Sequence, residues 1–173
     1  MASIQKKYVG LLGGSFDPAH NGHLGISKIA LKKLKLKKVY WVITKKNPFK
    51  KKTFYSLEER IRYAKKITNS QKKIKTIYLD KIIKSSRTAD VINYFINKKN
   101  IENIFFIIGS DNLIRFHKWK SWKKIVKKVK LIVFSRKGYD RKGMKSTVAK
   151  NFKNRIIFIK NKPISISSTQ LKK

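Results

Sequence analysis

Short apolar runs alternate with amphipathic stretches along the chain, and this pattern constrains the fold more than any other feature of the sequence. The apolar runs have the length of buried strands, and the stretches between them have the spacing of helices. Such an alternation is typical of a parallel sheet with helices packed on it. The predicted strands are residues 8–12, 39–43, 74–79, 104–108, 131–134 and 156–159.

The amphipathic stretches predict the helices that connect these strands. Ser56 and Glu59 have the spacing of a capping box, so a helix is expected to begin just after Ser56. A lysine-rich loop, residues 45–55, precedes it. The predicted helices cover residues 20–36, 56–68, 89–96 and 121–129.

The length and composition indicate one folded domain, residues 1–173. A hydrophobic content of 41% suits a packed core. No apolar run approaches the roughly 20 residues of a membrane span, and residues 1–7 do not open a secretory signal. The absence of cysteine excludes disulfides and thiolate metal sites, so we expect a cytoplasmic protein with no membrane partner.

The charge is strongly positive, with 45 Lys and Arg against 8 Asp and Glu. One interpretation is a basic nucleic-acid-binding module. The other is compositional drift, since Lys, Ile, Asn, Phe and Tyr are all abundant and the lysines are scattered over nearly every segment. We favour drift and expect no specific nucleic-acid partner. In either case the positive field attracts anionic small substrates.

Residues suited to chemistry follow the ends of predicted strands. In parallel α/β sheets, ligands bind beyond the carboxyl ends of the strands. Three segments of this chain follow the ends of predicted strands: residues 13–23, residues 109–111 and residues 167 onward. We therefore expect these segments to meet at one edge of the sheet.

The segment from Gly13 to His23 carries the strongest signal. Two of the three histidines, His20 and His23, lie here, after a glycine pair, Gly13 and Gly14. If the helix begins at residue 19 or 20, both imidazoles share a face near its N-terminus, where the helix dipole favours an anion. We expect the glycines to let the backbone approach phosphates, and the imidazoles, at least partly protonated, to donate hydrogen bonds to them.

Other chemistries fit this sequence less well. Paired histidines could bind zinc, but beyond Asp17 no third ligand lies nearby, so no protein-held metal site is expected. The few acids form no two-carboxylate hydrolase pair, and no GxSxG elbow occurs. Chemistry that relies on positive charge and positioning, as in nucleotidyl transfer, fits better. The acidic residues are Asp17, Glu58, Glu59, Asp80, Asp90, Glu102, Asp111 and Asp140.

The sequence resembles the HxGH nucleotidyltransferases, and among them the bacterial nicotinate-nucleotide adenylyltransferases. Residues 13–23 match every fixed position of that family's GG[ST]FDPxHxGH motif. Further matches follow in the family's order and cover almost the whole chain. They are Asn47-Pro48-Phe49-Lys50, Arg87-Thr88-Ala89-Asp90, Ile107 to Leu113 followed by Trp119, Ser135-Arg136, and Ile166 to Lys172.

The resemblance implies a Rossmann-like, nucleotidyltransferase-type sheet with helices on both faces, and a place in NAD biosynthesis. The implied reaction transfers the adenylyl group of ATP to nicotinate mononucleotide, giving deamido-NAD and pyrophosphate, with Mg²⁺ accompanying ATP. His20 and His23 would be catalytic. The implied ATP-binding residues are Gly13, Gly14, Ser15, Phe16, His20, His23, Gly109, Asp111, Ser168, Thr169 and Lys172. The implied mononucleotide-binding residues are Asn47, Lys50, Thr88 and Trp119. An oligomer is possible.

The chain departs from the family pattern at several positions. Arg87 stands where the family has tyrosine, Lys120 where an aromatic residue is common, and Lys172 where an arginine closes the last motif. A lysine keeps the charge but lacks the bidentate fork of arginine. The nearest rival is pantetheine-phosphate adenylyltransferase, which has threonine in place of His20. A class I tRNA synthetase is a poorer fit, because this chain is too short.

Overall fold

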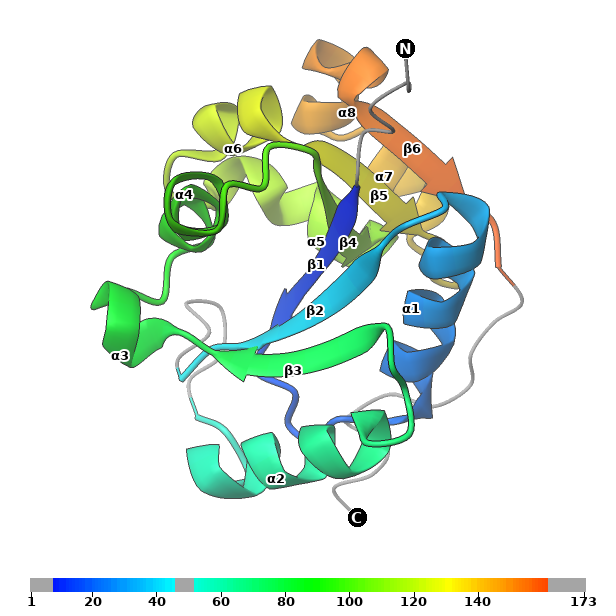
Figure 1. The fold of residues 1–173 in the computed structure, drawn as a ribbon. Helices are drawn as coiled ribbons and strands as arrows, with labels where there is room; N and C mark the ends of the chain where they lie inside the picture. Colours follow the sequence, from blue (N-terminus) through cyan, green and yellow to red (C-terminus); the bar gives the residue numbers. More distant parts are fainter. Residues whose placement is uncertain (1–7, 46–51, 162–173) are drawn as a thin grey trace, which may run out of the picture.

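The computed structural model describes residues 8–45 and 52–161, and these form one six-stranded sheet with helices around it (Figure 1). The strands lie in the order β3-β2-β1-β4-β5-β6, and every neighbouring pair is parallel. The chain therefore adopts the predicted Rossmann-like architecture. The strands are β1 (Val9–Gly14), β2 (Lys38–Ile43), β3 (Ile74–Tyr78), β4 (Ile104–Gly109), β5 (Lys130–Phe134) and β6 (Ile156–Ile159).

Helices connect the parallel strands, as crossover connections require. The helices are α1 (Asn21–Lys33), α2 (Leu57–Thr68), α3 (Asp80–Ile83), α4 (Thr88–Lys99), α5 (Ser110–Arg115), α6 (Trp122–Lys128), α7 (Asp140–Met144) and α8 (Thr147–Asn151). Two short 3₁₀ turns, η1 (Phe116–Lys118) and η2 (Lys153–Arg155), follow α5 and α8.

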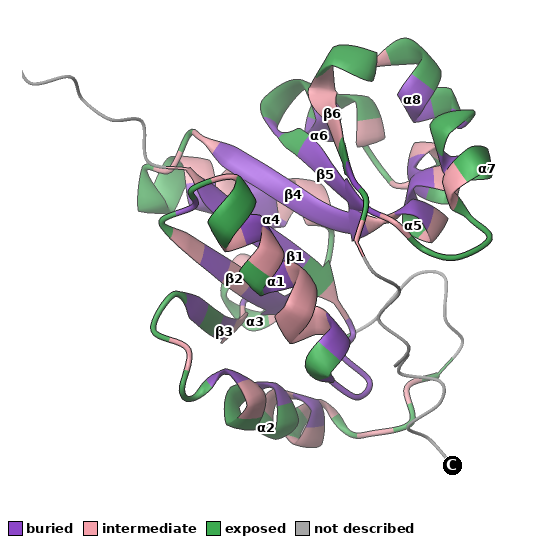
Figure 2. Cartoon of the chain, turned by 90° about the vertical axis from the view of Figure 1, so that its right-hand side faces the viewer, coloured by how far each residue is buried: buried purple, intermediate pink, exposed green. Residues whose placement is uncertain are grey.

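The core consists of two hydrophobic layers, one on each face of the sheet. Side chains along a strand alternate between faces, so neighbouring residues of one strand belong to different layers. In β4, Phe106 packs with Leu113 and Ile125 of α5 and α6, whereas Ile107 packs in the layer that contains Ala30 of α1. Figure 2 shows the buried residues along the strands and the exposed ones on the outer sides of the helices.

All six predicted strands and all four predicted helices are present, with ends shifted by a few residues. The predicted capping box at the start of α2 is confirmed: Ser56 Oγ accepts from the Glu59 amide, and the Glu59 carboxylate accepts from the Ser56 amide. The sequence pattern did not indicate α3, α5, α7 or α8. Each is only four to six residues long, too short to show a helical period.

The strand register brings two of the three predicted site segments, residues 13–23 and 109–111, to one edge, and the third lies outside the described residues. Gly14 at the end of β1 pairs with Ile43 at the end of β2, and Gly109 at the end of β4 pairs with Phe134 at the end of β5. The loops after these strands therefore lie at the same carboxyl edge. Among the described residues, no helix has both the length and the apolar character needed to cross a lipid bilayer.

Candidate active site

His20 and His23 form a reciprocal cap at the start of α1. His20 is the N-cap residue and lies just outside the helix, with an extended backbone. Its Nδ1 accepts a hydrogen bond from the Gly22 amide at 3.0 Å, and His23 Nδ1 accepts from the His20 amide at 3.2 Å. Two imidazoles thus occupy the places that serine and glutamate take in an ordinary capping box. The ring centroids lie 3.9 Å apart.

These caps determine which nitrogen of each ring carries a proton. An Nδ1 that accepts from an amide is unprotonated, so the proton of the neutral ring lies on Nε2. Each ring can therefore donate through Nε2–H without being a cation. Without a bound phosphate, burial, followed by the charge of Arg136, lowers the pKa of His20 from 6.5 to about 4.

The free protein should show His20 titrating near pH 4. The ring binds its proton less readily when folded than when unfolded, because burial penalises the cation. The folded state should therefore lose stability as the pH falls from about 6.5 to about 4, where the unfolded chain binds the extra proton. An NMR titration of the imidazole Cε1–H resonances checks this, with His20→Asn to assign the signal. A His20 midpoint near 6.5 would contradict it.

The ring of His23 packs against the aromatic side chains of Phe16 and Trp41. Phe16 stacks on Trp41 with ring centroids 5.1 Å apart and lies 4.8 Å from the His23 ring. Trp41 donates from Nε1 to Ser27 Oγ at 2.8 Å, and Ser27 Oγ in turn donates to the His23 carbonyl at 2.7 Å. This chain of contacts fixes the ring of His23 on the first turn of α1.

Asp17 anchors the chain that leads into α2. It is almost fully buried, and its two carboxylate oxygens accept from the amides of Phe54 and Tyr55 at 2.8 and 2.9 Å. The carboxylate of the first motif therefore binds backbone. This gives Asp17 a structural role that the sequence pattern did not indicate.

Replacing Asp17 with asparagine should destabilise the fold. The amide group of asparagine has one acceptor oxygen for two amide donors, so one part-buried N–H loses its charged partner at a cost of about 1–3 kcal/mol. Urea unfolding of Asp17→Asn measures this loss. Glu59→Gln is the control, because glutamine also closes a capping box and should leave the unfolding midpoint almost unchanged. Equal midpoints for Asp17→Asn and the wild type would refute the assigned role.

Arg60 is a site residue that the sequence motifs did not indicate. It lies in α2 with 1% of its surface exposed, and its guanidinium reaches the carbonyl oxygens of Ser15, Thr44 and Lys45. The available signal is its spacing, because Arg60, Ala64 and Thr68 form the buried stripe of the helix. A charged residue in such a stripe indicates a buried polar contact.

At the carboxyl ends of β4 and β5, Asp111 of α5 forms an ion pair with Arg136, which follows β5. Arg136 Nε lies 3.4 Å from Asp111 Oδ1. Asp140 of α7 holds the Arg136 backbone by accepting its amide at 2.9 Å. Hydrogen bonds from Ser110 and Ser135 to the same carboxylate lower the pKa of Asp140 below its usual value. Because Arg136 also lowers the pKa of His20, its charge acts on both halves of the site.

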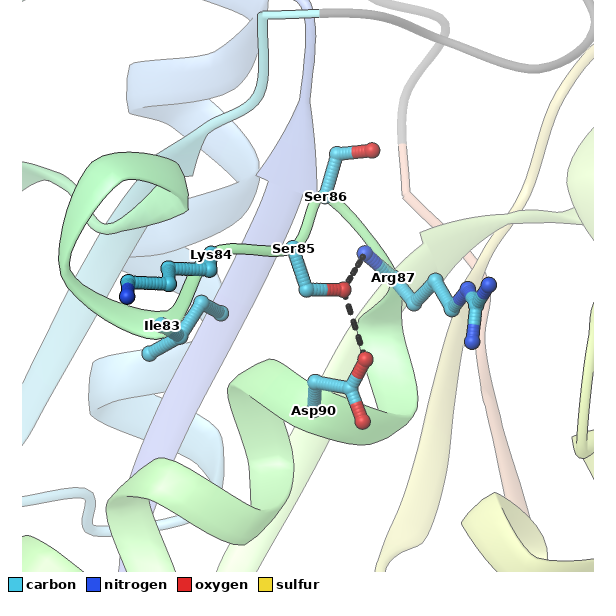
Figure 3. Close-up of a pocket in the computed structure, with 6 residues that line it drawn as sticks. All are labelled: Ile83, Lys84, Ser85, Ser86, Arg87 and Asp90. Carbon is cyan, nitrogen blue, oxygen red and sulfur yellow. Dashed lines mark hydrogen bonds between the residues drawn. The ribbon is translucent and has the colours of Figure 1, made fainter.

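A surface pocket of about 500 Å³ lies where the chain passes from α3 to α4 (Figure 3). Ser85 bridges two residues of this pocket: its hydroxyl donates to the Asp90 carboxylate at 2.6 Å and accepts from the Arg87 amide at 3.1 Å. Arg87, the N-cap of α4, precedes the predicted substrate residue Thr88, which is the first residue of the helix. The pocket is lined by Ile83, Lys84, Ser85, Ser86, Arg87 and Asp90.

The remaining predicted residues fall into three groups. Gly13 and Gly14 end β1, where a Cβ at Gly13 would contact the Phe106 ring at 3.5 Å and one at Gly14 would contact Phe16 at 3.8 Å. Trp119 is half-buried and stacks on Phe116 with centroids 4.7 Å apart, so it packs against the core. The residues outside the described ranges are Asn47, Lys50, Ser168, Thr169 and Lys172.

Within residues 8–45 and 52–161, no group of three or more His, Asp or Glu side chains could hold a metal ion. The carboxylates nearest the histidine motif and β4 are already engaged, Asp17 by two amides and Asp111 by Arg136. Nucleotidyltransferases generally use a divalent metal together with the nucleotide.

Comparison with known proteins agrees with the geometry. The family of cytidylyltransferase-like proteins matches residues 11–173. A probable nicotinate-nucleotide adenylyltransferase of Pelagibacter ubique is 49% identical over 170 residues, covering 98% of this chain and 94% of the relative. A probable nicotinate-nucleotide adenylyltransferase of Bradyrhizobium is 38% identical over 129 residues, and this match covers 74% of this chain and 67% of the relative.

The fold has solved counterparts. A nicotinic acid mononucleotide adenylyltransferase of Plasmodium falciparum, solved with NaAD, superposes with a TM-score of 0.73 at 18% identity and covers 95% of this chain and 82% of its own. At that identity the likeness concerns the architecture. The sequence relatives carry the assignment further: the chain belongs to the nicotinate-nucleotide adenylyltransferases, within the cytidylyltransferase-like family.

Proposed function

We propose that the chain transfers the adenylyl group of ATP to nicotinate mononucleotide, forming deamido-NAD and pyrophosphate, as a step of NAD biosynthesis. The 49% identity to a nicotinate-nucleotide adenylyltransferase over nearly the full length carries the proposal. A phosphate oxygen of the mononucleotide attacks the α-phosphorus of ATP, and the bond from that phosphorus to the β-phosphate oxygen breaks. Residues 1–173 act as a single nucleotidyltransferase domain, in the cytoplasm where ATP is supplied.

His20 and His23 serve as hydrogen-bond donors to the ATP phosphates. Their Nδ1 atoms accept from backbone amides in the cap, so each ring would donate to a phosphate through its Nε2–H. Donors held in place by backbone hydrogen bonds need no reorganisation as charge develops on the leaving pyrophosphate. The backbone of Gly13 and Gly14 at the end of β1, with Ser15 and Phe16 beyond it, binds the same phosphates on the strength of the family motif.

Asp111 receives the ribose hydroxyls of ATP, and Gly109 keeps the space beside it open. The ion pair with Arg136 keeps a carboxylate acceptor at the end of β4. Ser168, Thr169 and Lys172 complete the triphosphate side of this proposal, on the strength of the family motif alone. Mg²⁺ belongs to the substrate as MgATP, held by the phosphates.

The mononucleotide binds at the carboxyl edge of the sheet near the start of α4, away from the segment proposed to bind the ATP phosphates. Its phosphate and carboxylate are anionic, and Lys84 and Arg87 line the pocket that adjoins Thr88. Thr88 contributes a free amide at the first turn of α4, where the helix dipole favours a carboxylate. Asn47, Lys50 and Trp119 are the further mononucleotide-binding residues proposed from the motifs.

One assay tests the function. The purified chain is given MgATP with nicotinate mononucleotide, nicotinamide mononucleotide or phosphopantetheine, and pyrophosphate release is measured for each. Preference for nicotinate mononucleotide is the expected result. Preference for phosphopantetheine would instead identify a pantetheine-phosphate adenylyltransferase. No turnover, combined with salt-sensitive binding of RNA or DNA, would favour the basic nucleic-acid-binding module.

A further inference from the structure

Arg60 connects two loops that leave neighbouring strands at the candidate site. Its Nη1 donates to the Ser15 carbonyl at 2.7 Å and to the Thr44 carbonyl at 2.9 Å, and its Nη2 donates to the Lys45 carbonyl at 3.2 Å. Ser15 belongs to the loop between β1 and α1, residues 15–20, which we call the phosphate loop because it is proposed to bind the ATP phosphates. Thr44 and Lys45 follow β2, immediately before the residues proposed to bind the mononucleotide.

A buried arginine is a costly way to fill this space. Burial lowers the pKa of Arg60, which shows that the surroundings penalise its charge. Apolar residues of similar volume often pack as well as buried charged groups or better. Ala64 and Thr68, one and two turns further along the same stripe, are uncharged. Stability alone therefore does not account for a guanidinium at this position.

The direction of the N–H donors of Arg60 indicates a role in holding the two loops together. Both terminal nitrogens point to loop carbonyls, while Nε, among the described residues, has no hydrogen-bond partner. The planar fork of arginine fixes the separation of the acceptors that it bridges. A lysine, with one nitrogen, cannot set that separation in the same way.

We infer that Arg60 is a positioning residue that holds the phosphate loop and the segment after β2 at a fixed separation, so that the two substrates meet in line. The inference rests on the proposed function, because it assigns one loop to each substrate. Attack on the α-phosphorus needs the two reactants aligned, and a misplacement of about 1 Å costs about a hundredfold in rate. Loss of Arg60 should therefore reduce kcat more than it weakens the binding of either substrate.

The test uses Arg60→Met and Arg60→Lys. Methionine keeps the apolar stem without the donors, and lysine keeps the charge. For Arg60→Met we expect kcat to fall about thirtyfold or more, with each substrate's Kd within about threefold of the wild type. Arg60→Lys should recover only part of kcat. Amide exchange of residues 14–17 and 44–45 should also become faster in both variants.

Arg155→Met is the matched control. Arg155 likewise donates to three backbone carbonyls, those of Val126, Lys127 and Val129, but it precedes β6 at the opposite edge of the sheet. It should lose thermal stability while keeping kcat. A folded Arg60→Met or Arg60→Lys with wild-type kcat would overturn the inference, and so would equal kcat losses in the Arg60 and Arg155 variants. If Arg60→Met does not fold, Arg60→Lys decides.

Failure of the proposed function has a different signature. In that case the wild type itself releases no pyrophosphate from nicotinate mononucleotide and MgATP. Amide exchange then still decides whether Arg60 holds the two loops, because this measurement needs no substrate. Unchanged exchange at residues 14–17 and 44–45 in the Arg60 variants would overturn the inference independently of the reaction.

Discussion

Replacement of either His20 or His23 by asparagine should lower kcat about a hundredfold or more, because each change removes one donor to the developing phosphate charge. Alanine would be a less informative substitution. It deletes the Nε2–H donor together with the Nδ1 acceptor that caps α1, and loss of an N-cap alone costs about 1 kcal/mol. Asparagine places its carbonyl oxygen near the position of Nδ1 and has no atom near Nε2, so the cap is kept while the donor is lost.

Steady-state pyrophosphate release gives kcat, and thermal unfolding shows whether the cap survives. We expect a large fall in kcat with a small change in Tm for His20→Asn and His23→Asn. His20→Ala and His23→Ala should show the same fall in kcat and a larger loss of Tm. Near-normal turnover by both asparagine variants would refute the role of the imidazoles in catalysis. Equal Tm for asparagine and alanine variants would refute only the capping interpretation.

The strands and the motif that holds the histidines could be predicted from the sequence because both are local. An apolar run such as Ile104 to Ile108 reports burial directly, and the spacing of His20 and His23 places them together whatever the rest of the chain does. The sequence pattern also located Gly109 and Asp111 correctly at a strand end. Each of these features depends on neighbours within a few residues.

The contacts that organise the site are not local, and this is why they were missed. Arg60 reaches Ser15 across 45 residues, and Asp17 reaches Phe54 across 37. No periodicity encodes such pairs. The low pKa of His20 is equally non-local, because it comes from burial and from Arg136, which follows β5. The sequence pattern identified the imidazoles, but tertiary packing determines the charge of His20.

Replacement of Gly109 by alanine should raise the KM for ATP about tenfold, equivalent to about 1.4 kcal/mol of lost binding. Gly109 has φ −85° and ψ 159°, which alanine adopts without strain, so any effect arises from the added methyl group. That group would lie 2.3 Å from Asp111 Oδ1 and 3.0 Å from Arg136 Nε. The first distance is too short for a carbon atom and the second is tight, so the carboxylate has to turn away from the ribose position.

A double-mutant cycle makes this test specific to Asp111. If Gly109→Ala acts by displacing the carboxylate, then the same change in an Asp111→Ala background should cost almost nothing further, because contacting residues are not additive. Asn112→Ala, an exposed neighbour in α5, is the control and should leave the KM for ATP unchanged. Additive effects of Gly109→Ala and Asp111→Ala would mean that the methyl group blocks the nucleotide directly. In that case Asp111 would lose its proposed role as the ribose acceptor that Gly109 protects.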